Sequence, residues 1–160
     1  MVPRFPRRVY TADEVKKASK LIESGYKHRL TIKGDQAFRN KAREALKHVK
    51  TAGYYELLRT YIRQIVEIDG FSQLRESEAA VWANKHLLKN PIEAAGFFVQ
   101  KASQMQEFLE GKLYYGGAAE ARSVEKRIEF LKALKLESNE LAVKSECERI
   151  LERWAESTFL

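Results

Sequence analysis

The chain has 160 residues, a formal net charge of +7 and a single cysteine, Cys147. This length is enough for one domain with its own core. The composition, with 44% hydrophobic and 32% charged residues, excludes wholesale disorder. A single cysteine excludes both a disulfide framework and a cysteine-based zinc site. Because no apolar run is long enough to cross a bilayer and no apolar segment follows the basic start, we expect a cytoplasmic protein without a membrane partner.

The positive charge is concentrated at the beginning of the chain. Residues 1–50 contain 14 Lys or Arg against 5 Asp or Glu, whereas residues 51–160 contain 15 against 17. A basic segment of this kind is typical of an anionic partner such as nucleic acid or an acidic protein surface, although a solubilising face has the same composition. The candidate anion-binding side chains are Arg4, Arg7, Arg8, Lys16, Lys17, Lys27 and Arg29.

Residues 1–10 predict a basic, flexible arm, because Pro3 and Pro6 oppose helix formation. The remaining residues, 11–160, contain no repeat, no low-complexity tract and no linker long enough to divide them. They therefore predict one domain.

The first elements of that domain are a helix and a strand. Thr11 and Glu14 have the spacing of a capping box, which predicts a helix that reaches Glu23 and stops at Gly25. Between residues 26 and 33, apolar side chains alternate with polar ones. This period of two predicts a half-buried strand.

A second helix is expected between Asp35, which can cap its start, and Gly53. Its inward face comprises Phe38, Ala42, Ala45, Leu46 and Val49. The helical spacing that begins at Tyr54 gives way to β-branched residues, which predicts one or two helical turns and then a strand at about 60–68. Residues 79–88 have no polar face and predict a short buried strand.

Three more helices are expected in the second half of the chain. The first begins at the Asn90 cap, reaches Glu110 and buries Ile92, Ala95, Val99, Ala102, Met105 and Leu109. The next runs through Leu134 with Ala121, Val124, Ile128 and Leu131 inward, and the last follows Ser138 with Val143, Cys147, Ile150, Leu151 and Trp154 inward. The expected fold is α+β, with about five helices on a sheet of two or three strands; the alternative is an all-α bundle.

Several common kinds of active site have no signature in this chain. His28, His48 and His86 are isolated, without a second ligand three or four residues away, so each is expected on a strand or helix surface. The glycine pair Gly116-Gly117 lacks the lysine and spacing of a phosphate loop, and no nucleophile elbow occurs. We expect neither a bound metal nor a cofactor.

The order of segments from residue 28 to 134 resembles small bacterial proteins with a zincin-like core, that is, a zinc-metallopeptidase-like fold. In that family a strand and helix similar to HRLTIKGDQAFRNKAREALKHVK come first, followed by a segment like YYELLRTYIRQIVEI and an edge strand like AAVWANKHLL. Next come a helix with the zinc signature H-E-x-x-H, a loop rich in Tyr and Gly, and a glutamate on the following helix.

The resemblance implies that the zinc signature has degenerated. In its register the two histidines fall on Gln100 and Gln104, the general-base glutamate falls on Lys101, and the third ligand is kept as Glu120. An amide oxygen is a poor zinc ligand, and a lysine would place a positive charge beside the metal. On pattern alone, the stretch from Gln100 to Gln104 is equally compatible with a solvent-facing helix stripe.

These observations lead to three functional hypotheses. The first is a non-catalytic, zincin-like binding, regulatory or structural module that is not an enzyme and whose partner is another protein. The alternative is a nucleic-acid-binding accessory protein that uses the basic first third. The third is a homo-oligomer that buries the aromatic tail formed by Trp154, Phe159 and Leu160.

Overall fold

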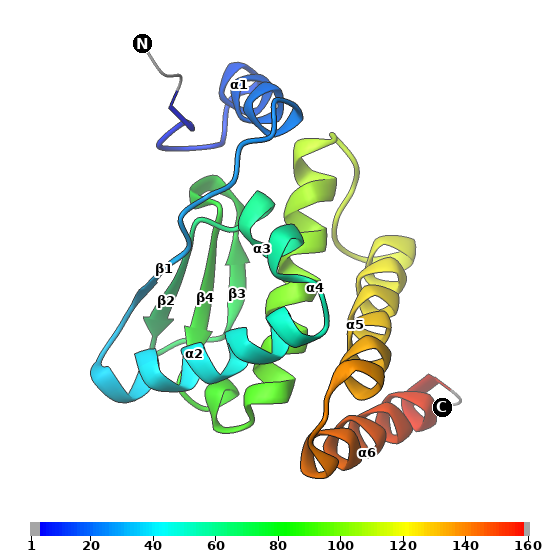
Figure 1. Ribbon diagram of the computed structural model, residues 1–160. Coiled ribbons are helices and arrows are strands. Elements are labelled where there is room, and N and C mark those ends of the chain that lie inside the picture. The colour runs from blue at the N-terminus through cyan, green and yellow to red at the C-terminus, as the bar shows by residue number, and fades with distance from the viewer. Residues whose placement is uncertain (1–3, 159–160) are drawn as a thin grey trace.

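Figure 1 shows the computed structural model of the protein, which describes the backbone of residues 4–158 and the side chains of residues 4–156. The described residues form an α+β fold of six α-helices and one four-stranded sheet. The order is α1 (Ala12–Glu23), β1 (Thr31–Lys33), α2 (Gln36–Thr51), α3 (Tyr55–Tyr61), β2 (Gln64–Ile68), β3 (Gln73–Arg75), β4 (Ala80–Asn84), α4 (Pro91–Leu109), α5 (Gly117–Glu137) and α6 (Leu141–Thr158). The predicted α+β class is confirmed, with one helix and at least one strand more than expected.

Three helices begin where local capping signals predicted. Thr11 forms a complete capping box at the start of α1. The carboxylate of Asp35 accepts a hydrogen bond from the amide of Phe38 at 2.8 Å, and the Asn90 side chain accepts from the first amides of α4. Each cap satisfies donors that have no partner inside the helix, so a short sequence motif is enough to fix the helix start.

The sheet is mixed, with strand order β1-β2-β4-β3. β1, β2 and β4 are parallel, and β3 lies antiparallel to β4 with Leu74 opposite Val81. β1 is shorter than the predicted strand over 26–33. The buried strand predicted over 79–88 is β4, but it pairs on both sides, so the expectation of an edge strand there is wrong. The two edges are β1 and β3, and β3 was not predicted.

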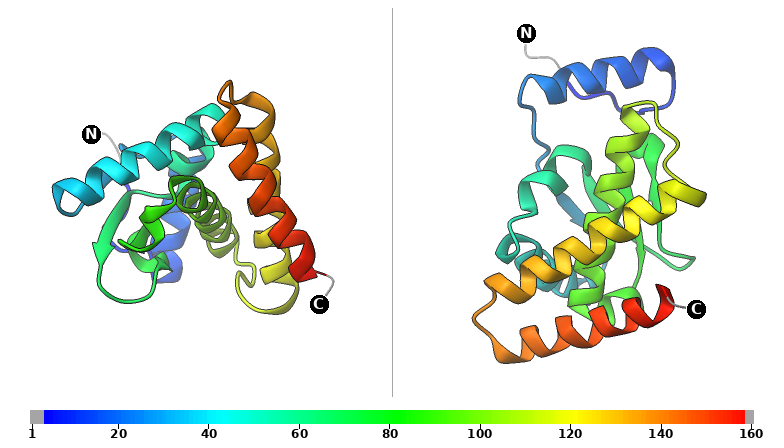
Figure 2. Two further views of the ribbon diagram at one scale, coloured as in Figure 1. Left: turned by 90° about the horizontal axis from the view of Figure 1, so that it is seen from below. Right: turned by 90° about the vertical axis from the view of Figure 1, so that its right-hand side faces the viewer.

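The core is organised around α4, which passes through the middle of the molecule between the sheet and α5 (Figures 1 and 2). The predicted inward faces of α2 and α4 are buried, and so are Val143, Cys147 and Ile150 of α6. Residues 4–10 and α1 lie at one end of the molecule, while α2 and α6 lie toward the other (Figure 1). None of the helices in the described part of the chain is long and apolar enough to span a membrane.

Of the inward face predicted for α5, only Leu131 is fully buried, and the rest of the prediction is wrong. Ala121 is exposed, and Val124 and Ile128 are only half-buried. The buried face instead comprises Ala119, Ser123, Arg127, Phe130, Leu131 and Leu134. The helix is therefore rotated so that a serine and an arginine meet α4, because both side chains find hydrogen-bond partners there.

Cys147 provides a test of how firmly α6 is packed. Its thiol is fully buried, and burial raises the pKa of Cys147 to about 11. Since the thiolate is the reactive form, we expect a chromogenic disulfide reagent at pH 8 to leave the native thiol unmodified and to modify it once denaturant unfolds the protein. Rapid modification of the native protein would show that α6 opens readily.

Candidate functional site

One side of α4 is polar and yet buried. It comprises half-buried Glu93 and buried Gln100, Gln104 and Glu107, whose spacing places them along the side of the helix that faces α5 and the loop before it. Gln100 and Gln104 are each 5% exposed. The alternative of a solvent-facing stripe is therefore wrong for both glutamines, and the cost of burying them requires hydrogen-bond partners.

Gln100 connects α4 to α5 through both atoms of its amide. Its Nε2 donates to the hydroxyl of Ser123 at 3.0 Å, and its Oε1 accepts from Nη1 of Arg127 at 3.1 Å. Ser123 in turn donates to the backbone carbonyl of Glu120. The amide of Gln100 is thus fully used in joining the two helices.

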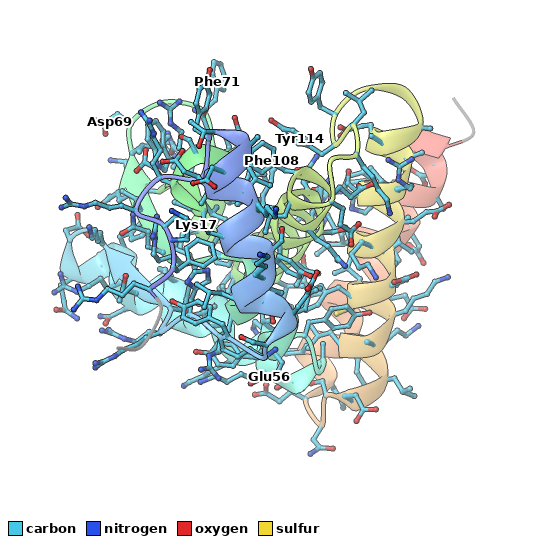
Figure 3. All side chains as sticks on the ribbon, turned by 90° about the horizontal axis from the view of Figure 1, so that it is seen from above. Lys17, Glu56, Asp69, Phe71, Phe108 and Tyr114 are labelled. Atoms are coloured by element: carbon cyan, nitrogen blue, oxygen red, sulfur yellow. The ribbon has the colours of Figure 1, made fainter. Side chains whose placement is uncertain are left out.

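Gln104 makes an equivalent pair of bonds one turn later. Its Oε1 accepts from Nζ of Lys101 at 2.9 Å, and its Nε2 donates to the carbonyl of Tyr114 at 3.2 Å. The ring of Tyr114 packs edge-on against Phe108, with 5.5 Å between centroids, and both side chains are labelled in Figure 3. Gln104 therefore holds the loop that precedes α5.

Lys101 lies between the two glutamines and the start of α5. Its ammonium group lies 4.9 Å from the ring centroid of Phe97. Burial lowers the pKa of Lys101, while the nearby charge of Glu120 opposes that shift. Of the four residues predicted at the degenerate zinc motif, Gln100, Lys101 and Gln104 thus lie on α4 where it meets α5 and the loop before it. Glu120 is exposed at the start of α5, where its backbone carbonyl accepts from Ser123 and its charge acts on Lys101.

A buried arginine that the sequence analysis missed completes this group. Arg127 is 9% exposed, and its Nη2 lies 3.3 Å from both the backbone carbonyl and Oε1 of Glu93. Its guanidinium stacks 5.2 Å from the centroid of Trp154. A Cβ at Gly96 would lie 3.2 Å from the arginine side chain, so the glycine leaves room for it. We call Gln100, Lys101, Gln104, Glu120, Ser123 and Arg127 the α4–α5 cluster.

The chemistry available to this cluster is hydrogen bonding and charge pairing. The oxygens of both glutamine amides already accept from cations. Within the described side chains, no group of three His, Cys, Asp or Glu could hold a metal ion together. The arrangement is therefore suited to fixing α5 on α4.

The basic residues of the N-terminal arm form a second candidate site. Arg63, at the start of β2, donates to the carbonyls of Pro6 at 3.0 Å, Arg7 at 2.8 Å and Glu78 at 2.8 Å. Val9 is fully buried, and its amide donates to the carbonyl of Ser77. These contacts attach the arm to the domain from residue 5 onward, which the prediction of a flexible arm did not anticipate.

A pocket of about 910 Å³ lies between this arm and α1. It is lined by Arg4, Phe5, Pro6, Arg7, Arg8, Glu14, Lys17 and Arg63. Four of the seven predicted anion-binding residues therefore meet here, and Lys17 projects from α1 on that side (Figure 3). We call this the basic pocket. Its lining does not include Lys16, Lys27 or Arg29, and Lys27 instead donates to the hydroxyl of Thr60.

His28 lies directly behind the arm, and its expected place on a strand surface is wrong. It is 1% exposed, Phe5 packs against it at 4.4 Å between centroids, and its Nε2 has no hydrogen-bond partner. Burial, and to a smaller extent the charge of Arg63, lowers the pKa of His28 to about 4. The other histidines are half-buried (His48) and exposed (His86).

Comparison of the chain with protein-family models, with curated proteins and with solved structures gives no match. The similarity to zincin-like proteins therefore stays a prediction, which rests on the order of the elements and on the residues of the α4–α5 cluster.

Proposed function

We propose that this protein is a non-catalytic, zincin-like protein that acts through binding, as a regulatory or structural module. The observation that carries the proposal is that Gln100, Lys101 and Gln104 lie where α4 meets α5, with the charge of Glu120 near enough to act on Lys101. These are the positions at which the resemblance would place two zinc ligands, a general base and a third ligand. Their meeting in space is what a degenerate zinc site requires.

The contacts of the cluster favour a structural role over catalysis. A zinc peptidase needs histidine nitrogens for the metal and a carboxylate that takes a proton from metal-bound water. Here amides replace the nitrogens, and Lys101 replaces the carboxylate. The ammonium of Lys101 supplies a positive charge near Glu120, as a metal ion would. Unlike a metal ion, it belongs to a side chain of α4 and cannot dissociate.

The arrangement of the sheet also supports the proposal. The helix that carries the degenerate motif, α4, packs beside a mixed sheet and contacts its antiparallel edge strand, β3. A zincin-like core likewise places an edge strand beside its zinc-binding helix. The resemblance placed the edge strand at 79–88, and that expectation is wrong; the strand that contacts α4 is β3.

The proposal is tested by restoring the motif. We expect the natural protein to contain no stoichiometric zinc by elemental analysis and to lack peptidase activity. The triple variant Q100H/K101E/Q104H should bind zinc in calorimetry about tenfold or more tightly than R43H/K47H, which places two histidines at the same spacing on the exposed side of α2. Glu120 then supplies a third ligand from the start of α5.

A fourth substitution identifies that ligand. Adding E120Q to the triple variant should reduce its zinc affinity to that of R43H/K47H, because the carboxylate is lost. Tight zinc binding with peptidase activity in the natural protein would refute the non-catalytic proposal. A triple variant that binds zinc no better than the control would refute the degenerate zinc site.

A further inference from the structure

The basic pocket brings five cations from three separate segments to one place. Arg4, Arg7 and Arg8 come from the arm, Lys17 from α1 and Arg63 from the start of β2. We infer that this pocket binds the phosphate backbone of single-stranded nucleic acid. The site is distinct from the α4–α5 cluster, so either proposal can fail without the other.

The wall of the pocket is held by hydrogen bonds from the Arg63 side chain to backbone carbonyls. The guanidinium of Arg63 binds three carbonyl oxygens, two of them in the arm. Phe5 stacks on Tyr26 at 5.5 Å between centroids and so secures the arm from its other side. Arg7 remains exposed although its carbonyl is held by Arg63, and Arg4, which precedes Phe5, is exposed as well. Binding a phosphate therefore does not require the arm to be ordered first.

The five cations of the pocket outnumber its one carboxylate, Glu14, which lies 3.7 Å from Arg8; Lys17 pairs with Asp13 of α1 at 3.2 Å. Glu14 also caps α1, where its Oε1 accepts from the amides of Thr11 at 2.8 Å and Tyr10 at 3.1 Å. The hydrogen bond from the Thr11 amide is the main cause that lowers the pKa of Glu14. The positive charge also continues beyond the pocket to exposed Lys16 and Lys20 on α1. An extended anion with several charges fits this arrangement better than a single phosphate.

An exposed aromatic side chain beside the pocket favours single-stranded nucleic acid over other polyanions. Tyr10 is 72% exposed, and the guanidinium of Arg8 lies 5.7 Å from its ring centroid. Basic grooves that bind single strands combine phosphate contacts with aromatic rings on which bases stack. The bases of a duplex are already paired and stacked, so they cannot use Tyr10 in this way.

The test measures fluorescence anisotropy of a labelled oligothymidylate of about 12 nucleotides with the full chain. We expect binding at about 50 mM salt that weakens steeply as salt rises. R4E/R7E should bind about tenfold more weakly or worse and lower the salt slope by about 1.4, if each arginine neutralises one phosphate. The matched variant K41E/K47E reverses two charges on α2, away from the arm, and should stay within about twofold of the natural protein.

Two further measurements decide the class of ligand. Y10A should weaken binding of the oligothymidylate but not competition by heparin, and a duplex of the same length should bind more weakly than the single strand. The inference is overturned if no binding occurs at low salt, or if K41E/K47E weakens binding as much as R4E/R7E. It is also overturned if Y10A has no effect and heparin or the duplex binds equally well, which would indicate unselective polyanion binding.

Discussion

Arg127→Ala is expected to lower the free energy of unfolding by about 3 to 5 kcal/mol. The substitution deletes a buried cation that bonds Gln100 of α4 and both the carbonyl and carboxylate of Glu93. It also removes the surface on which Trp154 of α6 stacks. Buried acceptors left without donors are the main source of this loss, because the structure cannot admit water to every one of them. Urea unfolding followed by far-ultraviolet circular dichroism measures the change.

Two variants separate lost hydrogen bonds from lost packing. Arg127→Met keeps most of the side-chain volume and should still be destabilised, because Oε1 of Gln100 stays unsatisfied. The double variant R127M/Q100M removes both members of the Arg127–Gln100 hydrogen bond and should recover the part of the loss due to that bond, since apolar replacement of a bonded pair is close to neutral; the acceptors of Glu93 still lack Arg127. Equal destabilisation of the single and double methionine variants would show that packing, rather than the unsatisfied amide, sets the stability of the α4–α5 interface.

The parts of the fold that were predicted correctly depend on signals within a few residues. Asp35 and Asn90 mark helix starts because a cap needs only its own side chain and the next amides. The inward face of α2 follows from its apolar spacing, since that face packs against other apolar residues. For such elements, local chemistry and tertiary contacts favour the same structure.

The parts that were missed depend on distant partners. β3 contains only one apolar residue, Leu74, and exists because it pairs with β4. Apolar spacing likewise misplaced the buried face of α5, because Ser123 and Arg127 become favourable inside only opposite Gln100. In the same way, spacing placed Gln100 and Gln104 on one side of a helix, but no sequence signal predicted which donors they would meet.

Protonation of His28 is expected to make the protein acid-sensitive well above the range in which carboxylates titrate. The pKa of His28 is lowered to about 4 in the folded state, against an ordinary value of 6.5. Between these two values the unfolded chain binds a proton that the folded chain does not, so stability falls as the pH falls. The free energy of unfolding should be constant above about pH 7 and decrease by about 1.4 kcal/mol per pH unit below 6.5, to a total of about 3 kcal/mol near pH 4.

The contacts of His28 explain why the folded state resists protonation. Its Nε2 is buried without an acceptor, its Nδ1 lies 3.3 Å from the hydroxyl of Tyr26, and the cations of Arg59 and Arg63 lie on neighbouring elements. No carboxylate contributes to the shift of its pKa. Protonation of His28 would therefore add a further positive charge beneath Phe5, next to the segment that forms the wall of the basic pocket.

His28→Leu should make the unfolding free energy independent of pH between about 7 and 5, apart from a remaining slope due to His48, because the unpartnered nitrogen and its titration are both removed. Burial also lowers the pKa of His48, so H48Q should remove that smaller part of the slope. The exposed His86 provides the matched control, since H86Q should leave the natural pH dependence intact.

Glu14 and Glu146, whose pKa values are lowered by hydrogen bonds, add their own loss of stability only below about pH 4.5. A natural slope that persists in H28L through the range from 6.5 to 4.5 would show that another group controls the acid sensitivity. A slope that disappears would assign it to the histidine beneath the arm.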